Sequence, residues 1–354
     1  MKKVLLTGGG TAGHVTPNIA LLPRLREEGC EVSYIGSKAG MERDLIEELG
    51  VPYVGIDTGK LRRYFDLKNL TDPFRVVHGF AEATRALREI APDVVFSKGG
   101  YVAVPVVMAA SRLRIPVIIH ESDMTPGLAN RLCIPRATKI CANFPETLAS
   151  LPADKAVLTG TPIRQELFAG SRESGLAFCG FTPDKPVMMV IGGSLGSAIV
   201  NDAVRAILPD LLGTFQVVHL CGKDKVDASL TRTPGYVQYE YIKAELADLF
   251  AAADLGVSRA GANAICELLA LKKPNILIPL GADKSRGDQI LNAHSFEKQG
   301  FSFVLEEQDV TNEALLEAIT DVYARRASYV EAMEQSGQGD AIETIINLMK
   351  EVSR

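Results

Sequence analysis

Three glycine-rich segments have the residue types and the setting needed to bind an anion. Each follows a short apolar run and precedes a helical pattern: Gly8-Gly9-Gly10-Thr11-Ala12-Gly13, Gly192-Gly193-Ser194-Leu195-Gly196 and Ser258-Arg259-Ala260-Gly261-Ala262. Small residues at such a junction let backbone amides and the helix N-terminus approach a phosphate group closely. The sequence therefore predicts phosphate-binding loops, with purely structural turns as the alternative.

The first loop also fits the G-x-G-x-x-G pattern of a dinucleotide site. That site needs an acidic residue at the end of the second strand to hold the ribose, whereas the run Val32–Ile35 ends in Gly36-Ser37-Lys38. NAD is therefore disfavoured, and Lys38 leaves NADP as an alternative. His14 directly follows this loop, at the end of a predicted strand where open α/β sheets bind ligands, which makes it a candidate functional residue.

The second loop offers a different chemistry, because it also matches the G-x-S-x-G elbow of α/β serine hydrolases. Ser194 would be the nucleophile, and Asp283 or Asp288 with His294 would complete the required order. Such a hydrolase has a single sheet, which would leave the first glycine loop and the strands after it unexplained. Phosphate binding is therefore the favoured interpretation.

Three further side chains could contact a nucleotide sugar near these loops. Glu267, within two turns of the third loop, could accept the ribose hydroxyls, and Arg164 could clamp a phosphate. Gln289 lies in a polar stretch and could bond a sugar hydroxyl.

The elements that position these residues form a repeating pattern. Apolar runs alternate with helix-length amphipathic segments, which indicates a parallel sheet covered on both faces. The predicted strands are Val4–Thr7, Val32–Ile35, Val51–Ile56, Val94–Ser97, Val117–His120, Lys139–Ala142, Val187–Ile191, Gln216–Leu220, Val237–Tyr241, Leu255–Val257 and Asn275–Pro279. A helix is expected over Pro17–Glu28, ended by Gly29.

The strand–loop–helix pattern starts twice, which predicts two domains. The stretch from Thr159 to Pro186 breaks the rhythm, so the boundary is placed near Pro162, giving domains 1–162 and 163–354. A final helix at about 340–354 would be able to pack back on the first domain. The expected fold class is α/β, with two Rossmann-like, doubly wound parallel-sheet domains facing each other across a cleft.

Composition narrows the function classes. The 354 residues include 38 Lys+Arg and 43 Asp+Glu, a net charge of −5, which argues against nucleic-acid binding through bulk charge. The six cysteines are scattered and the five histidines show no metal-ligand spacing, so no metal is predicted. The first apolar run stops at Thr7, too short for a signal peptide. We expect a cytoplasmic protein, or one on the cytoplasmic face of a membrane.

Six motifs, in this order, resemble the MurG family of peptidoglycan glycosyltransferases: Gly8 through Pro17, Lys98-Gly99-Gly100-Tyr101, His120-Glu121, Gly160-Thr161-Pro162-Ile163-Arg164, Gly192 through Gly196, and Ser258 through Glu267. The resemblance implies the GT-B fold and a hexosyltransferase. It also implies inverting, metal-independent transfer of N-acetylglucosamine from UDP-GlcNAc to the 4-hydroxyl of the MurNAc-pentapeptide of lipid I, giving lipid II, without a cofactor. A UDP-GlcNAc epimerase is the alternative within this fold.

The resemblance also assigns site residues. Donor contacts fall on Thr11, Ala12, Gly13, Asp123, Arg164, Ser194, Ile242, Ala262, Asn263, Ala264, Ile265, Cys266, Glu267 and Gln289. Position 123 is often Asn in the family, and Asp123 cannot donate as an amide does. Thr-Ala-Gly replaces the family's Thr-Gly-Gly, which needs a negative φ at Ala12. His14 is the candidate base, or else a ligand of the acceptor diphosphate, with His120 and Glu121 as orienting or substitute groups.

One segment interleaves basic and large apolar residues: Lys60, Leu61, Arg62, Arg63, Phe65, Leu67, Lys68 and, further on, Phe74. Such a segment can lay apolar side chains into a membrane interface while its cations meet anionic lipids. The alternative is an ordinary connection whose apolar residues pack inward. The polyprenyl-linked acceptor that the resemblance implies favours an anionic membrane surface as a partner.

Overall fold

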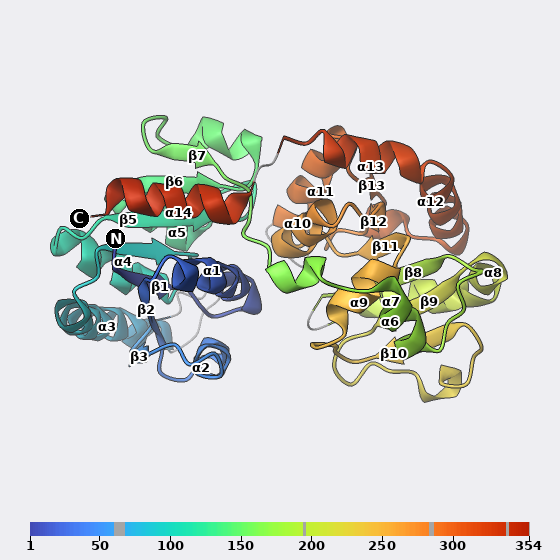
Figure 1. Ribbon diagram of the computed structural model, residues 1–354, viewed down its shortest axis with the longest axis horizontal. Coiled ribbons are helices and arrows are strands. Elements are labelled where there is room, and N and C mark those ends of the chain that lie inside the picture. The colour runs from blue at the N-terminus through green and yellow to red at the C-terminus, as the bar shows by residue number, and fades with distance from the viewer. Residues whose placement is uncertain (60–67, 194–195, 283–286, 338–339, 354) are drawn as a thin grey trace. The chain divides into compact units, whose positions relative to one another are not determined.

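The computed structural model describes residues 1–59, 68–193, 196–282, 287–337 and 340–353, with the backbone alone for 68–74. The chain divides into two compact units (Figure 1). Unit 1 is Met1–Arg164 with Gln338–Arg354, and unit 2 is Gln165–Gly337.

Unit 1 contains a parallel sheet with the strand order β3-β2-β1-β4-β5-β6-β7 in the described residues. Its strands are β1 (Lys3–Thr7), β2 (Glu31–Ser37), β3 (Tyr53–Ile56), β4 (Val94–Ser97), β5 (Val117–Glu121), β6 (Lys139–Ala142) and β7 (Ala156–Leu158). Its helices are α1 (Thr16–Glu27), α2 (Met41–Glu47), α3 (Lys68–Ile90), α4 (Ala103–Arg112), α5 (Leu128–Cys133) and α14 (Ala341–Val352). The reversal of strand order beside β1 is the Rossmann switch point, where this class of sheet binds ligands.

The two faces of this sheet bury different helices, because side chains alternate along a strand. On β1, Val4 and Leu6 pack into a core with α1 and α14, whereas Leu5 packs into a core with α3 and α4. Helix α14 is amphipathic and buries Ile345 and Met349 in the first of these cores. The last helix of the chain is thus an integral part of unit 1.

Unit 2 repeats the topology, with the parallel order β10-β9-β8-β11-β12-β13 in its described part. Its strands are β8 (Val187–Ile191), β9 (Gln216–Leu220), β10 (Tyr236–Tyr239), β11 (Leu255–Ser258), β12 (Asn275–Leu277) and β13 (Phe303–Val304). Its helices are α6 (Arg172–Cys179), α7 (Ala198–Ala206), α8 (Leu208–Thr214), α9 (Leu246–Ala252), α10 (Ala262–Ala270), α11 (Asp288–Lys298), α12 (Asn312–Ala324) and α13 (Arg326–Glu334). One face packs on α7, α8 and α12.

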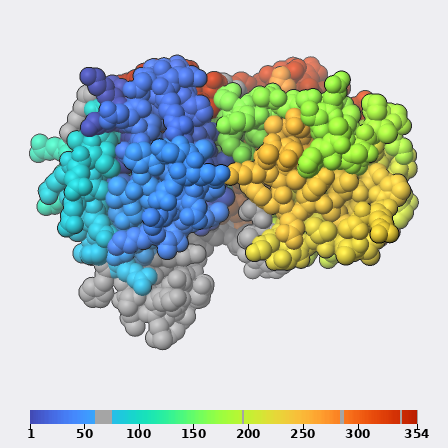
Figure 2. Space-filling view, turned by 60° about the horizontal axis from the view of Figure 1, so that its bottom comes forward, coloured from blue at the N-terminus to red at the C-terminus, as the bar shows by residue number. Residues whose placement is uncertain are grey.

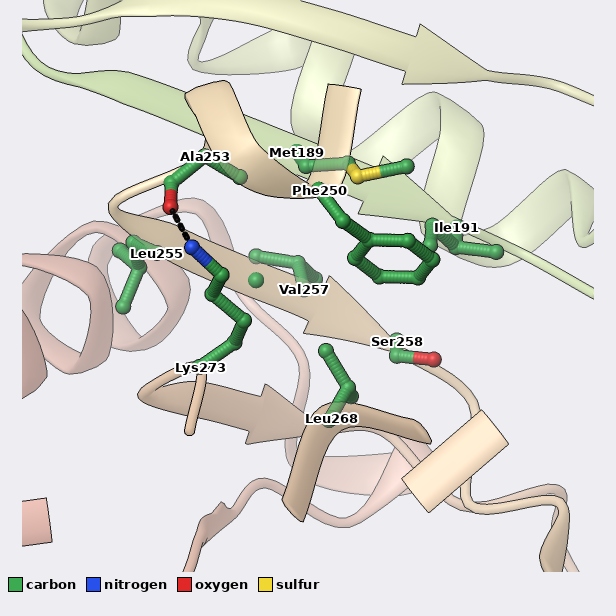
Figure 3. A pocket seen from close by; sticks show the side chains of 10 residues that line it. Met189, Ile191, Phe250, Ala253, Leu255, Val257, Ser258, Leu268 and Lys273 are labelled. Carbon is green, nitrogen blue, oxygen red and sulfur yellow. Dashed lines mark hydrogen bonds between the residues drawn. The ribbon is translucent and has the colours of Figure 1, made fainter. Parts of the chain in front are cut away.

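The opposite face of the second sheet contains a small apolar void of about 10 Å³ beside β11 (Figure 3). Phe250, Leu268 and the stem of Lys273 surround it, and the Lys273 Nζ donates to the Ala253 carbonyl at 2.9 Å. Burial lowers the pKa of Lys273. The void is at the lower limit of the volume that holds a water molecule, and its lining is too apolar to bind one.

The predicted α/β class with two Rossmann-like parallel sheets is confirmed, and each of the eleven expected runs forms a strand. Two strands were not predicted, β7 and β13, which are short and lie at sheet edges. The expected helix at Pro17–Glu28 is observed as α1, one residue earlier at each end. Within the described part of the chain, no helix is both long and apolar enough to cross a membrane.

Candidate functional site

An open pocket of about 490 Å³ lies in unit 2, at the carboxyl ends of β8, β11 and β12. Its lining brings the second and third glycine loops together through Gly193, Gly196, Arg259 and Gly261. Helices α7 and α10 both begin at this pocket. Two helix N-termini supply amide donors and partial positive charge in one place, which suits a diphosphate.

Arg259 is only 8% exposed and connects several segments that line this pocket. Its guanidinium donates to the Ile278 and Pro279 carbonyls at 3.0 and 3.1 Å and to the Ser197 Oγ at 2.7 Å. An ion pair of 2.5 Å joins it to Glu307. Since Ser197 is the N-cap of α7, Arg259 connects the start of α7 to the ends of β11 and β12.

The described donor candidates of unit 2 take different positions. Ala264 and Gln289 line the pocket, and the Gln289 Oε1 accepts a hydrogen bond of 3.0 Å from the Leu280 amide. Glu267 and Asn263 are half-buried on α10. The buried candidates outside the pocket lining are Ile242, Ala262, Ile265 and Cys266. Ser194 lies outside the described residues.

In unit 1 the first glycine loop leads into the short 3-10 turn η1 (Ala12–His14). The His14 Nδ1 lies 3.0 Å from the Thr11 Oγ1. The Lys98–Tyr101 segment packs directly on this loop: a Cβ at Gly100 would lie 2.4 Å from the Gly9 carbonyl and 3.2 Å from the His14 Nδ1. Ala12 is not among the described non-glycine residues with a positive φ, so its methyl group causes no backbone strain.

His120 is fully buried at the end of β5 and both of its ring nitrogens are engaged. The Lys98 ammonium, which can only donate, is 2.9 Å from the His120 Nδ1, and the His120 Nε2 is 2.8 Å from the Gly160 carbonyl. The proton of the neutral ring is therefore on Nε2. Burial, reinforced by the charge of Lys98, holds the pKa of His120 well below its usual value.

Glu121 is 4% exposed and organises the turn that follows β5. Its carboxylate accepts hydrogen bonds from the Asp123 and Gly127 amides at 3.0 and 3.1 Å and from the Asn130 Nδ2 at 2.9 Å. Burial raises the pKa of Glu121, and these three donors oppose that rise. Asp123 is half-buried at the start of the turn, and Arg164 is half-buried at the end of unit 1's first segment.

The structure argues against the two alternative functions, NADP binding and serine hydrolysis. Lys38, which an NADP site would need, is 2.8 Å from Asp57 and 2.7 Å from Glu82. These two carboxylates balance its positive charge. His294, the proposed hydrolase histidine, pairs with Glu297 at 3.1 Å and Glu306 at 2.9 Å. Both sheets also have the Rossmann strand order, which argues against a serine hydrolase with its single sheet.

Two of the membrane-surface candidates, Lys68 and Phe74, belong to α3. The other six, Lys60, Leu61, Arg62, Arg63, Phe65 and Leu67, lie outside the described residues, as do the side chains of Lys68 and Phe74.

The sequence gives no role to two buried cations, Lys98 in unit 1 and Arg259 in unit 2, although both belong to motifs that it predicts. The signal for both was a single cation beside two glycines or a glycine and an alanine, directly after an apolar strand. A basic side chain that is buried at the end of a strand needs a buried acceptor, and the linear sequence does not identify that acceptor.

Known proteins match the chain over nearly its whole length. Residues 4–142 match the glycosyltransferase family 28 N-terminal domain, and residues 187–349 match the family's C-terminal domain. A protein of Lachnoclostridium phytofermentans named UDP-N-acetylglucosamine–N-acetylmuramyl-(pentapeptide) pyrophosphoryl-undecaprenol N-acetylglucosamine transferase is 65% identical over 99% of both chains. Its namesake from Lachnospira eligens is 64% identical over 100% of both.

Solved structures agree with these relatives. MurG of Acinetobacter baumannii is 27% identical, with a TM-score of 0.79 over 99% of this chain and 100% of that one. The UDP-GlcNAc 2-epimerase of Neisseria meningitidis has a TM-score of 0.71 over 99% of this chain and 100% of that one, but at 14% identity it shows a shared fold alone.

Proposed function

The chain belongs to glycosyltransferase family 28, and from that membership we propose that it transfers N-acetylglucosamine from UDP-GlcNAc to lipid I, giving lipid II for peptidoglycan. The observation that carries this proposal is the 65% identity over 99% of a relative whose name states this donor and this acceptor. The transfer is inverting and independent of metal ions, and it uses no cofactor.

The donor binds in unit 2. Its diphosphate lies over the N-termini of α7 and α10, and the leaving UDP is stabilised there by backbone amides and helix dipoles. Gln289 and Ala264 line the pocket that takes the nucleotide sugar. Ser194, Ile242, the rest of 262–267, Arg164, Asp123 and the Thr11–Gly13 stretch remain the other proposed donor contacts.

The acceptor hydroxyl loses its proton to His14 as the bond from C1 to UDP breaks. The contact between the His14 Nδ1 and the Thr11 Oγ1 supports this role, because it orients the ring. His120 and Glu121 act as positioning residues. Both are buried. His120 contacts the Lys98 ammonium and the Gly160 carbonyl, and Glu121 accepts hydrogen bonds from the turn at 122–127.

Because the acceptor carries an undecaprenyl chain, we also propose that the enzyme works as a peripheral protein on the cytoplasmic face of the cell membrane. The interleaved basic and apolar residues from Lys60 to Phe74 support an anionic lipid surface as the partner.

The test is transfer of labelled N-acetylglucosamine to a lipid I analogue, with and without EDTA, followed by NMR of the new anomeric centre. We expect label in the lipid-linked product at equal rates in both, with inverted configuration. Turnover of UDP-GlcNAc in the absence of acceptor would instead indicate an epimerase, and a loss of transfer in EDTA would contradict metal independence.

A further inference from the structure

A buried carboxylate occupies the inner side of the first glycine loop. Glu42, in the first turn of α2, is 0% exposed although it is an acidic residue on a helix whose other face is at the surface (Figure 2). Its Oε2 accepts a hydrogen bond from the Gly10 amide at 3.3 Å. Its Oε1 accepts from the Ser37 amide at 3.1 Å and the Ser37 Oγ at 2.5 Å.

The surrounding glycines make room for this carboxylate. A Cβ at Gly9 would lie 2.6 Å from the Glu42 Cδ, and a Cβ at Gly40 would lie 2.3 Å from both carboxylate oxygens. Real Cβ atoms do not approach so closely, so neither position admits a larger residue while Glu42 stays in place. The absence of a side chain at Gly9 therefore makes room for the Glu42 carboxylate. The sequence pattern alone predicts that it makes room for a bound phosphate.

The loop that Glu42 contacts also carries His14. The Gly8 carbonyl accepts from the buried Tyr34 hydroxyl at 2.9 Å, and a Cβ at Gly8 would lie 2.5 Å from the His14 carbonyl. Glu42 thus connects the end of β2, through Ser37, to the loop between β1 and His14.

We propose that Glu42 is an internal anion that fills the first glycine loop, keeps nucleotide phosphate out of it and positions His14 for catalysis. The catalytic part of this inference rests on the proposed transferase function, whereas the occupancy of the loop does not. A carboxylate that accepts from a loop amide satisfies the donor that a phosphate would otherwise bind. Donor diphosphate is thereby directed to unit 2.

The test is chemical rescue of Glu42→Ala by formate. The truncation leaves a carboxylate-sized space beside the Gly10 amide and Ser37, which formate can enter. We expect kcat for transfer to fall roughly 10- to 100-fold, because a displacement of about 1 Å near the reacting atoms costs that much. Added formate then restores most of the lost rate with saturating dependence, while chloride at the same ionic strength does not.

Two variants serve as controls. Asp44→Ala removes an exposed acidic side chain from the same helix and should behave as wild type. Glu42→Gln retains the size of the side chain, so it should lose activity without recovering it in formate. Gly9→Ala should be harmful alone and much less so in combination with Glu42→Ala, because the carboxylate it meets is gone.

Thermal unfolding supplies a readout that does not depend on transfer. Formate should raise the Tm of Glu42→Ala more than that of wild type or Asp44→Ala, even if wild type proves unable to transfer the sugar. A folded Glu42→Ala with wild-type kcat overturns the positioning role, as does formate stabilisation without recovery of rate. The absence of any selective stabilisation by formate overturns the occupancy of the loop.

Discussion

Replacing Arg259 by methionine should destabilise unit 2 around the pocket that its glycine loops line. The substitution retains most of the side-chain volume but removes the cation beside Glu307, whose side chain is only 9% exposed. It also removes the donor to the Ser197 Oγ and to two strand-end carbonyls. The ion pair of 2.5 Å between Arg259 and Glu307 would be lost.

The expected loss follows from the removal of this ion pair. Breaking a buried ion pair by removing one partner costs about 3–5 kcal/mol, which corresponds to a drop in Tm of about 6–20 °C for a unit of this size.

Thermal unfolding of Arg259→Met, Glu307→Met and the double variant measures this coupling. The double variant should recover part of the stability that the single Arg259→Met variant loses, because the Glu307 carboxylate is then also absent. The hydrogen bonds of Arg259 to Ser197, Ile278 and Pro279 are lost in both variants. A drop in Tm below about 2 °C for Arg259→Met, or a double variant no more stable than the single one, would contradict a stabilising role of the Arg259–Glu307 ion pair.

Three further predictions concern single contacts. Gly196→Ala should destabilise the protein by about 1–3 kcal/mol more than Gly193→Ala in urea unfolding, because both residues have positive φ but only the Cβ at position 196 would meet a backbone carbonyl, at 1.8 Å. Equal losses would contradict the clash. Lys98→Met should cost about 1–3 kcal/mol by leaving the His120 Nδ1 without a donor, and it should raise the pKa of His120 in an NMR titration because a neighbouring cation is gone. Lys273→Met should abolish a gain in stability that wild type shows as the pH rises towards 10.5, since burial lowers the pKa of Lys273 and the unfolded chain then holds more protons. Identical slopes of unfolding free energy against pH would contradict it.

The strands were predictable because each is an apolar run bounded by glycine, proline or polar residues. Runs such as Val187–Ile191 are short, continuously apolar and almost wholly buried, as is typical of strands covered on both faces of a sheet. The two missed strands, β7 and β13, have three and two residues and are only partly buried. Pairing with a neighbouring strand makes them strands, and that pairing is a tertiary property.

The site was predictable as loops but not as contacts. Sequence placed the second and third glycine loops at helix starts, where the pocket has them. It could not show that Ile265 and Cys266 turn into the core, since a continuous motif on a helix spreads over all its faces. Glu42 has the appearance of an ordinary first-turn glutamate, favoured there by the helix dipole. Only the fold brings it to the first loop.

The electron density of a crystalline complex with UDP-GlcNAc tests the central claim most directly. We expect the diphosphate oxygens within hydrogen-bond distance of backbone amides at the starts of α7 and α10, beside Gly196 and Gly261, with the first glycine loop still filled by Glu42. A diphosphate bound at Gly8–Gly10, with Glu42 displaced, would contradict it.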